Sequence, residues 1–467
     1  MKKATTLILT LIASAVLLTN AFAQSFSSEE LQRRMVERRA VDAAIWGLPI
    51  ISEDALRQAY FRDGKANYGD IIWWPKNNDW MNQSLTPNTS VRYLYSFINT
   101  KESGPIVLNL PAAANGSRFL GTISDAWQVP LTDIGVEGKS EKYLVLPPGY
   151  TEEIPSGYIP VRPKTYNSFI AARSILASNS DKNVNIGNEL VKKIKIYPLS
   201  KANNPPIQRF IDMTGTLYSG LVKYDESLYI NLARLLNEEP VQPKDRQMMG
   251  MLLQLGIKKG EKFDPDEATI EQLRLAAKEA EQWLLSQLPG FVTDWWPNSQ
   301  WKIPINSIAP ETGFKWEVPN YFDVDGRGIA FSTFFVPPAK LGAGSFYLGT
   351  FFDGNSQLLD GSNNYHLHVP ANVPVSQFWS LTVYNSKTSG LFLNMNRPSL
   401  DSLTESLQIN TDGSVDLYMG QTAPPGMASN LIKIPKGKGW FPWFRFYGPE
   451  QALFNKSWKM PDIEKVK

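Results

Sequence analysis

Apolar residues recur at the spacing of an α-helix near the start of the chain. Ser27 and Glu30 have the spacing of a capping box, which predicts that a helix begins at this point. We expect this helix to stop or bend at the Gly-Leu-Pro sequence of residues 47–49, because proline removes a backbone donor. A second short helical stretch is predicted around residues 53–60.

Two further helical patterns lie in the middle of the chain. Asp225 is the predicted cap of the first pattern, which is predicted to end at Gly256, in the position where glycine commonly terminates a helix. Asp264 is the predicted cap of the second, with Pro265 at the first helical position. Both patterns carry an apolar stripe that is predicted to face a core: Leu228, Leu232, Leu235, Leu236, Ile270, Leu273, Ala277, Ala280, Trp283 and Leu284.

Short β-prone runs occupy the chain on either side of this helical block. One set lies within residues 91–163 and includes VRYLYSFIN, PIVLNLP, RFLGTIS and KYLVLPPG, each separated from the next by glycine, proline or asparagine. The other set runs from residue 346 to residue 447. The pattern therefore predicts a mainly β fold with helical insertions, α+β in class.

A weak internal echo links the two β-rich parts. VLNLP at 107–111 precedes FLGTI at 119–123, and HLHVP at 366–370 precedes FWSLT at 378–382. The proline and the phenylalanine are separated by the same number of residues in both parts, from Pro111 to Phe119 and from Pro370 to Phe378. We interpret each pair as a strand, a proline-containing loop and a returning strand, a hairpin-like module used twice.

The first residues predict export from the cytoplasm. Lys2 and Lys3 precede a short apolar run, and the Ala-Phe-Ala sequence at 21–23 has the pattern that signal peptidase reads. We expect cleavage after Ala23 and a periplasmic or secreted product. The run is shorter than the ~20 residues that span a bilayer, so we expect no stable insertion into the membrane after cleavage.

Composition narrows the classes of function. The chain has 467 residues and no cysteine, which excludes disulfides and thiol nucleophiles. Its 47 Lys and Arg nearly balance its 45 Asp and Glu without a basic cluster, so we expect no nucleic-acid partner. Aromatic residues make up 12% of the chain, which is typical of β-sandwich cores and of surfaces that stack on sugars or flat ligands.

Several longer motifs resemble a family of mostly bacterial, often exported, two-domain proteins. LTPNTSVRYLYSFIN, GPIVLNLP and FLGTISDAWQVPLTDIG resemble its N-terminal half, DUF1254, and EEPVQPKDRQMMGMLLQLGIKKGEKFD resembles its connecting segment. LDGSNNYHLHVP, FWSLTVYNSKTSGLFLN and FRFYGPEQALFNKSWKMPDIE resemble its C-terminal half, DUF1214. Both halves are domains of unknown function, so the resemblance implies a fold and no activity.

The resemblance implies two β-sandwich or jelly-roll-like domains with helices between them. We place a signal peptide at 1–23 and a helix with the N-terminal sandwich at 24–180. A helical connecting segment follows at 181–300, and the C-terminal sandwich lies at 301–467. In the family pattern a histidine stands at His368, whereas His366 occupies a variable position, which counts against a two-histidine site common to the family.

Both histidines of the chain lie in one predicted strand, YHLHVP at 365–370. Strand alternation places Tyr365, Leu367 and Val369 on an apolar face and the two imidazoles on the other, facing solvent or a pocket. His366 and His368 could be hydrogen-bonded structural residues, ligands of a metal together with an acid such as Asp353 or Asp360, or acid–base catalysts. Either could also contact a bound ligand, and we expect His368 to line a cleft. The sequence leaves these alternatives open.

The remaining candidates lie near strand ends. Asp125 could act as an acid or, beside Trp127, bind sugar hydroxyls, although a turn-capping role fits it as well. Asn88 is a candidate ligand contact that also suits a turn. In WFPWFRFYGP, the phenylalanines suit a core face, which leaves Arg445 and Tyr447 to contact a ligand, with Arg445 facing a carboxylate or phosphate.

Two classes of function remain. The first is binding of a small molecule or glycan in a polar and aromatic cleft. The second is a periplasmic hydrolase, metal-assisted or not, with a polar centre near His368. No Gly-x-Ser-x-Gly elbow, phosphate loop or His-Glu-x-x-His motif occurs, and no motif identifies a cofactor.

Overall fold

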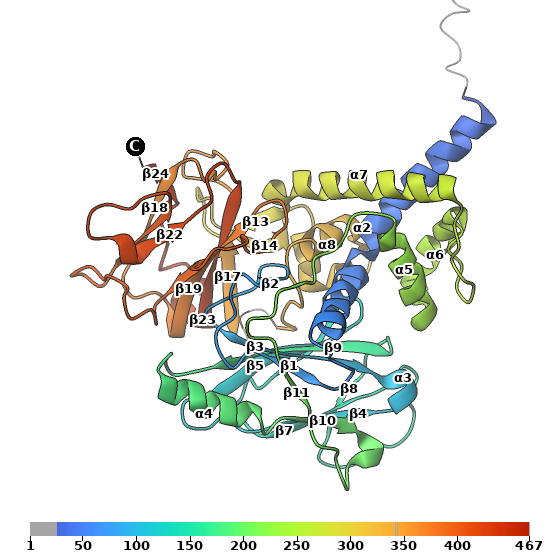
Figure 1. Ribbon diagram of the computed structural model, residues 1–467, viewed down its shortest axis with the longest axis horizontal. Helices are drawn as coiled ribbons and strands as arrows, with labels where there is room; N and C mark the ends of the chain where they lie inside the picture. Colours follow the sequence, from blue (N-terminus) through green and yellow to red (C-terminus); the bar gives the residue numbers. More distant parts are fainter. Residues whose placement is uncertain (1–25, 341, 343, 467) are drawn as a thin grey trace, which may run out of the picture.

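The computed structural model describes residues 26–340, 342 and 344–466. It consists of two β-sandwiches and a group of helices that packs beside both (Figure 1). The N-terminal sandwich lies at the bottom of the view, the C-terminal sandwich at the upper left, and the helices on the right. The predicted signal peptide and its cleavage after Ala23 fall outside the described residues and stay predictions.

The N-terminal sandwich pairs a six-stranded sheet with a four-stranded sheet around one apolar core. The first sheet has the order β11 (Phe210–Asp212), β1 (Ile71–Trp73), β3 (Arg92–Asn99), β9 (Asn167–Ile175), β5 (Arg118–Asp125), β6 (Pro130–Ile134). The second has the order β10 (Lys195–Pro198), β4 (Ile106–Leu110), β7 (Glu141–Val145), β8 (Ile159–Val161). The four strands predicted from sequence in this region are confirmed as β3, β4, β5 and β7.

The C-terminal sandwich has the same composition of sheets around a second core. Its six-stranded sheet has the order β13 (Val292–Asp294), β14 (Lys302–Asn306), β17 (Ser345–Gly349), β23 (Trp440–Pro449), β19 (Val375–Asn385), β20 (Ser399–Asp401). Its four-stranded sheet has the order β22 (Leu431–Lys433), β21 (Val415–Gly420), β18 (Asn364–Val369), β24 (Glu464–Val466). Two short two-stranded pairs complete the strands: β2 (Asn82–Gln83) with β12 (Tyr218–Ser219), and β15 (Glu317–Val318) with β16 (Tyr321–Phe322).

The two sandwiches have the same strand topology. Within the six-stranded sheets, the spatial order β1-β3-β9-β5-β6 corresponds strand for strand to β14-β17-β23-β19-β20. The four-stranded orders β10-β4-β7-β8 and β24-β18-β21-β22 correspond in the same way, and β7–β8 and β21–β22 are both parallel. The halves are therefore structural repeats, as the internal echo suggested.

The interpretation of each pair of sequence segments as a hairpin was wrong. β4 and β5 do not form a hairpin, because β4 lies in the four-stranded sheet and β5 in the six-stranded one, and β18 and β19 are divided in the same way. Phe119 lies in the core of its sandwich, whereas Phe378 lies on the opposite face of its sheet and stacks on Tyr447. The equal spacing in the sequence thus does not mark equivalent residues.

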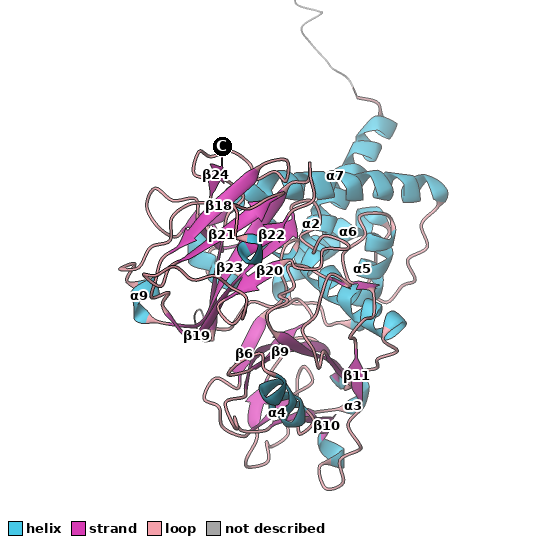
Figure 2. Ribbon diagram, turned by 60° about the vertical axis from the view of Figure 1, so that its left-hand side comes forward, coloured by secondary structure: helices cyan, strands magenta, loops and turns pink. Residues whose placement is uncertain are grey.

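Five of the helices, α2, α5, α6, α7 and α8, form a layer that contacts both halves, while α3 and α4 lie on the N-terminal sandwich and α9 lies on the C-terminal one (Figure 2). Ser27 caps α2, as predicted, because its hydroxyl accepts a hydrogen bond from the backbone N–H of Glu30. The leucine and alanine stripes of α5 and α7 are buried as predicted. The helices are α2 (Ser28–Asp63), α3 (Thr100–Ser103), α4 (Asp181–Val191), α5 (Ser227–Glu238), α6 (Arg246–Leu252), α7 (Glu267–Phe291), α8 (Val324–Phe331) and α9 (Gln451–Phe454).

Two predicted helix boundaries differ from the structure. α2 neither stops at Pro49 nor yields to a second helix, but continues through the proline as one 36-residue helix. There Gln128 donates a side-chain hydrogen bond to the Pro49 carbonyl, and residues from 40 to 60 are largely buried. α7 begins later than predicted, because Asp266 rather than Asp264 is its cap and bonds the backbone N–H of Thr269.

The fold class is mixed, mainly β with helical parts, as predicted. The jelly-roll topology stays a prediction. Residues 181–300, expected to connect the domains, contain helices but also supply β10 and β11 to the N-terminal sheets. In the part of the chain that the structure covers, no helix has the length and apolar character needed to cross a membrane.

Candidate functional site

A cavity lies where the two six-stranded sheets approach each other, and we call it the interdomain cavity. It encloses about 1050 Å³ of space free of protein atoms, part of it open to solvent. Strands β3, β5 and β9 line it from one half and β14, β17 and β23 from the other, and two loops, around residues 85–87 and 334–338, also line it. Its walls are largely apolar, with Phe314, Phe334, Phe335, Val336, Phe346 and Trp443 among them.

Each half contributes one arginine and one tyrosine from corresponding strands. Arg173 on β9 pairs across strands with Tyr93 on β3, and Arg445 on β23 pairs with Tyr347 on β17. Each guanidinium lies over the ring of its partner, at 5.7 Å for Arg173 and 5.0 Å for Arg445. Because β9 corresponds to β23 and β3 to β17, the two pairs are equivalent positions of the structural repeat.

Strand alternation explains why both arginines face the cavity. On β23, Phe444 and Phe446 point into the core of the sandwich, so Arg445 points the other way. On β9, Ile170 and Ala172 belong to the N-terminal core, while Arg173 shares the opposite face with Phe169. The prediction that Phe444 and Phe446 of WFPWFRFYGP form a core face is confirmed.

The cavity holds positive charge without an acid to balance it. The residues that line it include no aspartate or glutamate, and neither arginine takes part in an ion pair among the described residues. One terminal nitrogen of Arg445 donates to the Thr86 carbonyl at 2.9 Å, but its Nη1 is buried without a hydrogen-bond partner. The Nε of Arg173 is also buried without one.

Asp133 lies in an adjoining small cavity that Arg173 also lines. Its carboxylate accepts hydrogen bonds from the Thr122 hydroxyl at 2.8 Å and from two backbone N–H groups, those of Ala339 and Lys340, each at 2.9 Å. The Asp133 carboxylate therefore holds the loop that follows residue 338 through three hydrogen bonds.

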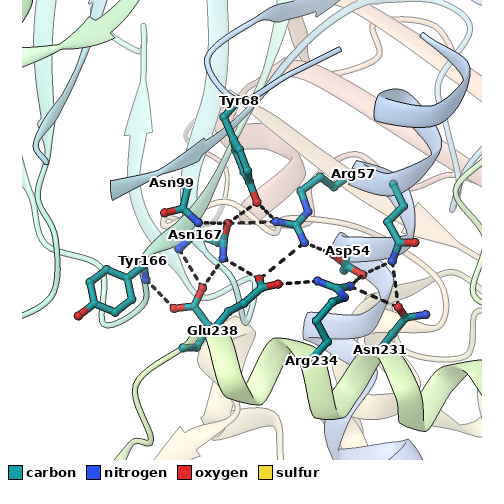
Figure 3. Close-up of polar contacts among 11 residues, drawn as sticks. Asp54, Arg57, Tyr68, Asn99, Tyr166, Asn167, Asn231, Arg234 and Glu238 are labelled. Atoms are coloured by element: carbon teal, nitrogen blue, oxygen red, sulfur yellow. Dashed lines mark hydrogen bonds and ion pairs between the residues drawn. The ribbon is translucent and has the colours of Figure 1, made fainter. Parts of the chain in front are cut away.

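A second pair of arginines, Arg57 and Arg234, is balanced by carboxylates (Figure 3). Arg57 on α2 and Arg234 on α5 both contact Asp54, and Arg234 also bonds Glu238 at 2.8 Å. Asn167 at the start of β9 joins the network, because its side-chain oxygen accepts a hydrogen bond from Arg57 Nη1 at 3.1 Å. These arginines are held by carboxylates and join the helical layer to the N-terminal sandwich, in contrast to the pair in the interdomain cavity.

The arginines also affect the phenol groups around them. Burial acts to raise the pKa of Tyr347, but the positive charges of Arg173 and Arg445 outweigh burial and leave the pKa below its usual value. The hydroxyl of Ser345 lies 3.2 Å from that of Tyr347 and donates to it. The cavity thus favours negative charge at Tyr347, as it would on a bound anion.

Both loops of the cavity contain a strained backbone position. Thr86 has a φ of 39° and Val336 a φ of 40°, values that are rare for β-branched side chains. Thr86 is held by hydrogen bonds to the carbonyls of Ser389 at 2.7 Å and Thr333 at 3.0 Å, and the Val336 N–H donates to the Gln128 side chain at 3.1 Å. Such strain persists only where neighbouring contacts impose it, and it clusters at functional sites.

The structure brings three of the candidate residues from the sequence together. Arg445 lines the interdomain cavity, and Tyr447 lines the adjoining small cavity beside Arg173. Asn88 lies behind them, where its side-chain amide donates to the Tyr447 hydroxyl at 2.6 Å and its backbone N–H donates to the Tyr93 hydroxyl at 2.8 Å. Asn88 therefore positions two tyrosines, and its own side chain does not line the cavity.

Asp125 and Trp127 lie elsewhere, against the helical layer. One oxygen of Asp125 accepts from the backbone N–H groups of Trp127 at 2.9 Å and Val129 at 3.0 Å, which is the turn-capping arrangement. Burial raises the pKa of Asp125 to about 6, against these hydrogen bonds. Trp127 packs on Trp46 of α2 with ring centres 4.7 Å apart.

His366 and His368 lie on the outer face of the C-terminal four-stranded sheet. Tyr365, Leu367 and Val369 are buried, as strand alternation predicted, and both rings are partly exposed. His366 Nε2 and His368 Nδ1 each lie 2.8 Å from the same oxygen of Asp416 on β21. The acid beside the histidines is thus Asp416, whereas Asp353 bonds backbone N–H groups of its own turn.

Asp416 is held in its charged form. Burial acts to raise its pKa, but hydrogen bonds from both rings and from Asn410 outweigh burial and lower the pKa to about 2. Neither histidine lines the cavities between the domains. Across the described residues, no group of three or more His, Cys, Asp or Glu side chains is arranged to hold a metal ion.

Sequence reasoning missed Arg173, Tyr93 and Tyr347. The available signal was an arginine within an otherwise apolar strand, SFIAARSIL, which resembles the setting of Arg445 in WFRFYG. A charged side chain inside such a run must face a polar group or a cavity. That signal finds Arg173, but it does not place Arg173 beside Arg445.

Comparison with known proteins agrees with this architecture. Residues 69–198 match the family described as protein of unknown function DUF1254, and residues 344–451 match protein of unknown function DUF1214. Arg173 lies in the first match and Arg445 in the second. No curated protein matches the chain significantly.

One solved structure shares the fold, and a second is similar at a lower score. The VPA0106 protein from Vibrio parahaemolyticus is similar over 92% of this chain and 100% of its own, with 18% sequence identity and a TM-score of 0.56. An uncharacterised protein from Burkholderia cenocepacia is similar over 93% of this chain and 94% of its own, with 12% identity and a TM-score of 0.41. The chain is a two-domain DUF1254/DUF1214 protein of unknown function.

Proposed function

We propose that the protein binds a small molecule that has an acidic group on an apolar body, and that the interdomain cavity is the binding site. The observation that carries this proposal is the pair of arginines, Arg173 and Arg445, in a largely apolar cavity that no aspartate or glutamate lines. The acidic group would lie between the guanidinium groups, and the phenylalanine-rich walls would contact the rest of the molecule.

The physical argument is the energy of an uncompensated charge. A buried charge is strongly unfavourable unless it is paired and hydrogen-bonded. A carboxylate, phosphate or sulfonate would supply both, because the planar guanidinium group can bond two of its oxygens at once. The apolar walls would strengthen these contacts by excluding water from them.

A fluorescent probe tests the proposal. Anilinonaphthalene sulfonate carries a sulfonate on an aromatic body, and phenylnaphthylamine is the matching neutral molecule. We expect the purified protein to bind the sulfonate, and Arg173→Met and Arg445→Met each to weaken it about tenfold or more, since hydrogen bonds to charged groups contribute about 1.5–3 kcal/mol. Binding of the neutral probe should change much less.

The control is Arg118→Met. Arg118 lies on β5 of the same sheet and donates to backbone carbonyls at residues 135 and 136, away from the cavity. It should leave sulfonate binding unchanged. Equal binding of the charged and neutral probes, or equal binding by wild type and both cavity variants, would contradict the proposal.

Two alternatives from the sequence have less support. A glycan would need many polar contacts, whereas the walls of this cavity are largely apolar. A hydrolase centred on His368 would need a nucleophile or activated water at the ring, and among the described residues the hydrogen-bond partner of each ring is Asp416.

A further inference from the structure

A second cavity lies beside the interdomain cavity, and we call it the side cavity. It encloses about 640 Å³ of space, part of it open to solvent. Its walls come from α7, from the end of α8 and from the loops around residues 221–224 and 387–389. Most of its lining is apolar, including Leu221, Val222, Leu284, Leu285 and Phe331.

Leu85 is the side chain that lines both cavities. The end of α8 and the segment after it also border both cavities, with Phe331 and Ser332 at the side cavity and Phe334 and Phe335 at the interdomain cavity. The two spaces are therefore neighbours, and Leu85 stands between them.

The backbone next to Leu85 is fixed from both sides. Thr86 bonds to the carbonyl of Ser389, which lines the side cavity, and accepts a hydrogen bond from Arg445, which lines the interdomain cavity. The strained φ of Thr86 belongs to this same position. The arginine site and the side cavity are thus held together by one residue of the loop.

We infer that the ligand is an elongated acid with a flexible apolar chain. Its acidic group lies at Arg173 and Arg445, and its chain passes Leu85 into the side cavity. This inference rests on the proposed function, since it needs the arginines to hold the acid. The side cavity would contribute through burial of apolar chain, which strengthens binding by up to roughly fourfold for each methylene group.

A series of alkyl carboxylates tests the length of the ligand. Hexanoate and dodecanoate share the acidic group and differ in chain length, and each is measured by displacement of anilinonaphthalene sulfonate. We expect dodecanoate to bind at least tenfold more tightly than hexanoate to the wild-type protein. We expect Arg173→Met to weaken the binding of both.

Two variants test where the alkyl chain of the ligand lies. Leu85→Trp enlarges a side chain at the boundary of the two cavities, and Val222→Trp enlarges a side chain in the lining of the side cavity alone. Each should remove most of the gain from the longer alkyl chain, and hexanoate should bind Val222→Trp within about twofold of wild type, because Val222 does not line the interdomain cavity. Leu393→Trp, at an exposed leucine, is the matched control and should keep the gain.

The results separate this inference from the proposed function. If hexanoate binds through the arginines but dodecanoate binds no more tightly, the elongated ligand is wrong and the anion site stands. The same conclusion follows if both tryptophan variants fold, as judged by melting temperature, and retain the full gain. If neither acid binds through the arginines, the proposed function fails and this inference fails with it.

Discussion

Two pairs of arginines in this protein differ in their charged partners. Arg57 and Arg234 are neutralised by Asp54 and Glu238, and they belong to the framework. Arg173 and Arg445 have no such acid, and they lie in a cavity. The difference is one of partners rather than burial. Because Arg173 has no carboxylate partner, we expect that Arg173→Met, which removes an uncompensated charge, does not lower the melting temperature.

Asp125 gives a pH-dependent prediction at the same scale. Burial raises its pKa from the usual 3.8 to about 6, which corresponds to about 3 kcal/mol at about 1.4 kcal/mol per pKa unit. A raised pKa means that the native state favours the protonated acid, so this contribution to stability is complete below about pH 4 and is lost as the pH rises through 6. Asp125→Asn keeps an oxygen that can accept from Trp127 and Val129.

We therefore expect Asp125→Asn to match wild type near pH 4 and to exceed it in stability by up to about 3 kcal/mol at pH 8. Urea unfolding at a series of pH values measures this difference. A difference that stays constant from pH 4 to pH 8 would show that the carboxyl group titrates normally in the folded protein.

At the scale of elements, alternation along a strand was the most informative signal. It placed Tyr365, Leu367 and Val369 in the core and Arg445 on the face opposite to Phe444, because residue parity decides which face of a sheet a side chain occupies. Local patterns were less reliable where tertiary contacts decide. Pro49 remains inside α2 because that part of the helix is buried against its neighbours.

The start of α7 is a case that mutation can check. The sequence offers two aspartates as caps, and the structure assigns the role to Asp266, which bonds the Thr269 N–H at 2.8 Å. We expect Asp266→Ala to reduce the free energy of unfolding by about 0.5–2 kcal/mol. Asp264→Ala, at an exposed residue that contacts Lys262, should stay within about 0.5 kcal/mol of wild type. If chemical denaturation shows a larger loss of stability for Asp264→Ala than for Asp266→Ala, Asp264 is the cap.

At the scale of the whole molecule, the site arises from repetition. Two sandwiches of one topology contribute equivalent arginine–tyrosine pairs, and the site forms only where their larger sheets meet. Strand patterns and the family resemblance predicted two β-rich halves. These sequence signals could not predict that Arg173 and Arg445 line one cavity, because the two residues lie far apart in the chain and local patterns do not determine how two domains pack.

The loop of residues 85–90 contacts the C-terminal half at this site, and the energetic coupling between Asn88 and Tyr447 can be measured. Asn88 donates to the Tyr447 hydroxyl at 2.6 Å, and both residues are buried. Asn88→Ala should be the more damaging single change, because its side chain also accepts from the Ser90 N–H at 2.8 Å, whereas Tyr447→Phe removes one hydroxyl. Each single change leaves a buried group unpaired, which costs about 1–3 kcal/mol.

Because the two changes break one contact, their effects should not add. We expect the double variant to be less destabilised than the sum of the single variants by about 0.5–3 kcal/mol, as found for residues in direct contact. Asn88→Ala combined with Asp266→Ala is the control pair, since these residues share no partner and their effects should add within about 0.5 kcal/mol. Additive effects for Asn88 and Tyr447 would mean that this hydrogen bond does not join the domains in solution. A coupling within the expected range would show that the loop fixes the position of β23, and with it Arg445, relative to the N-terminal half.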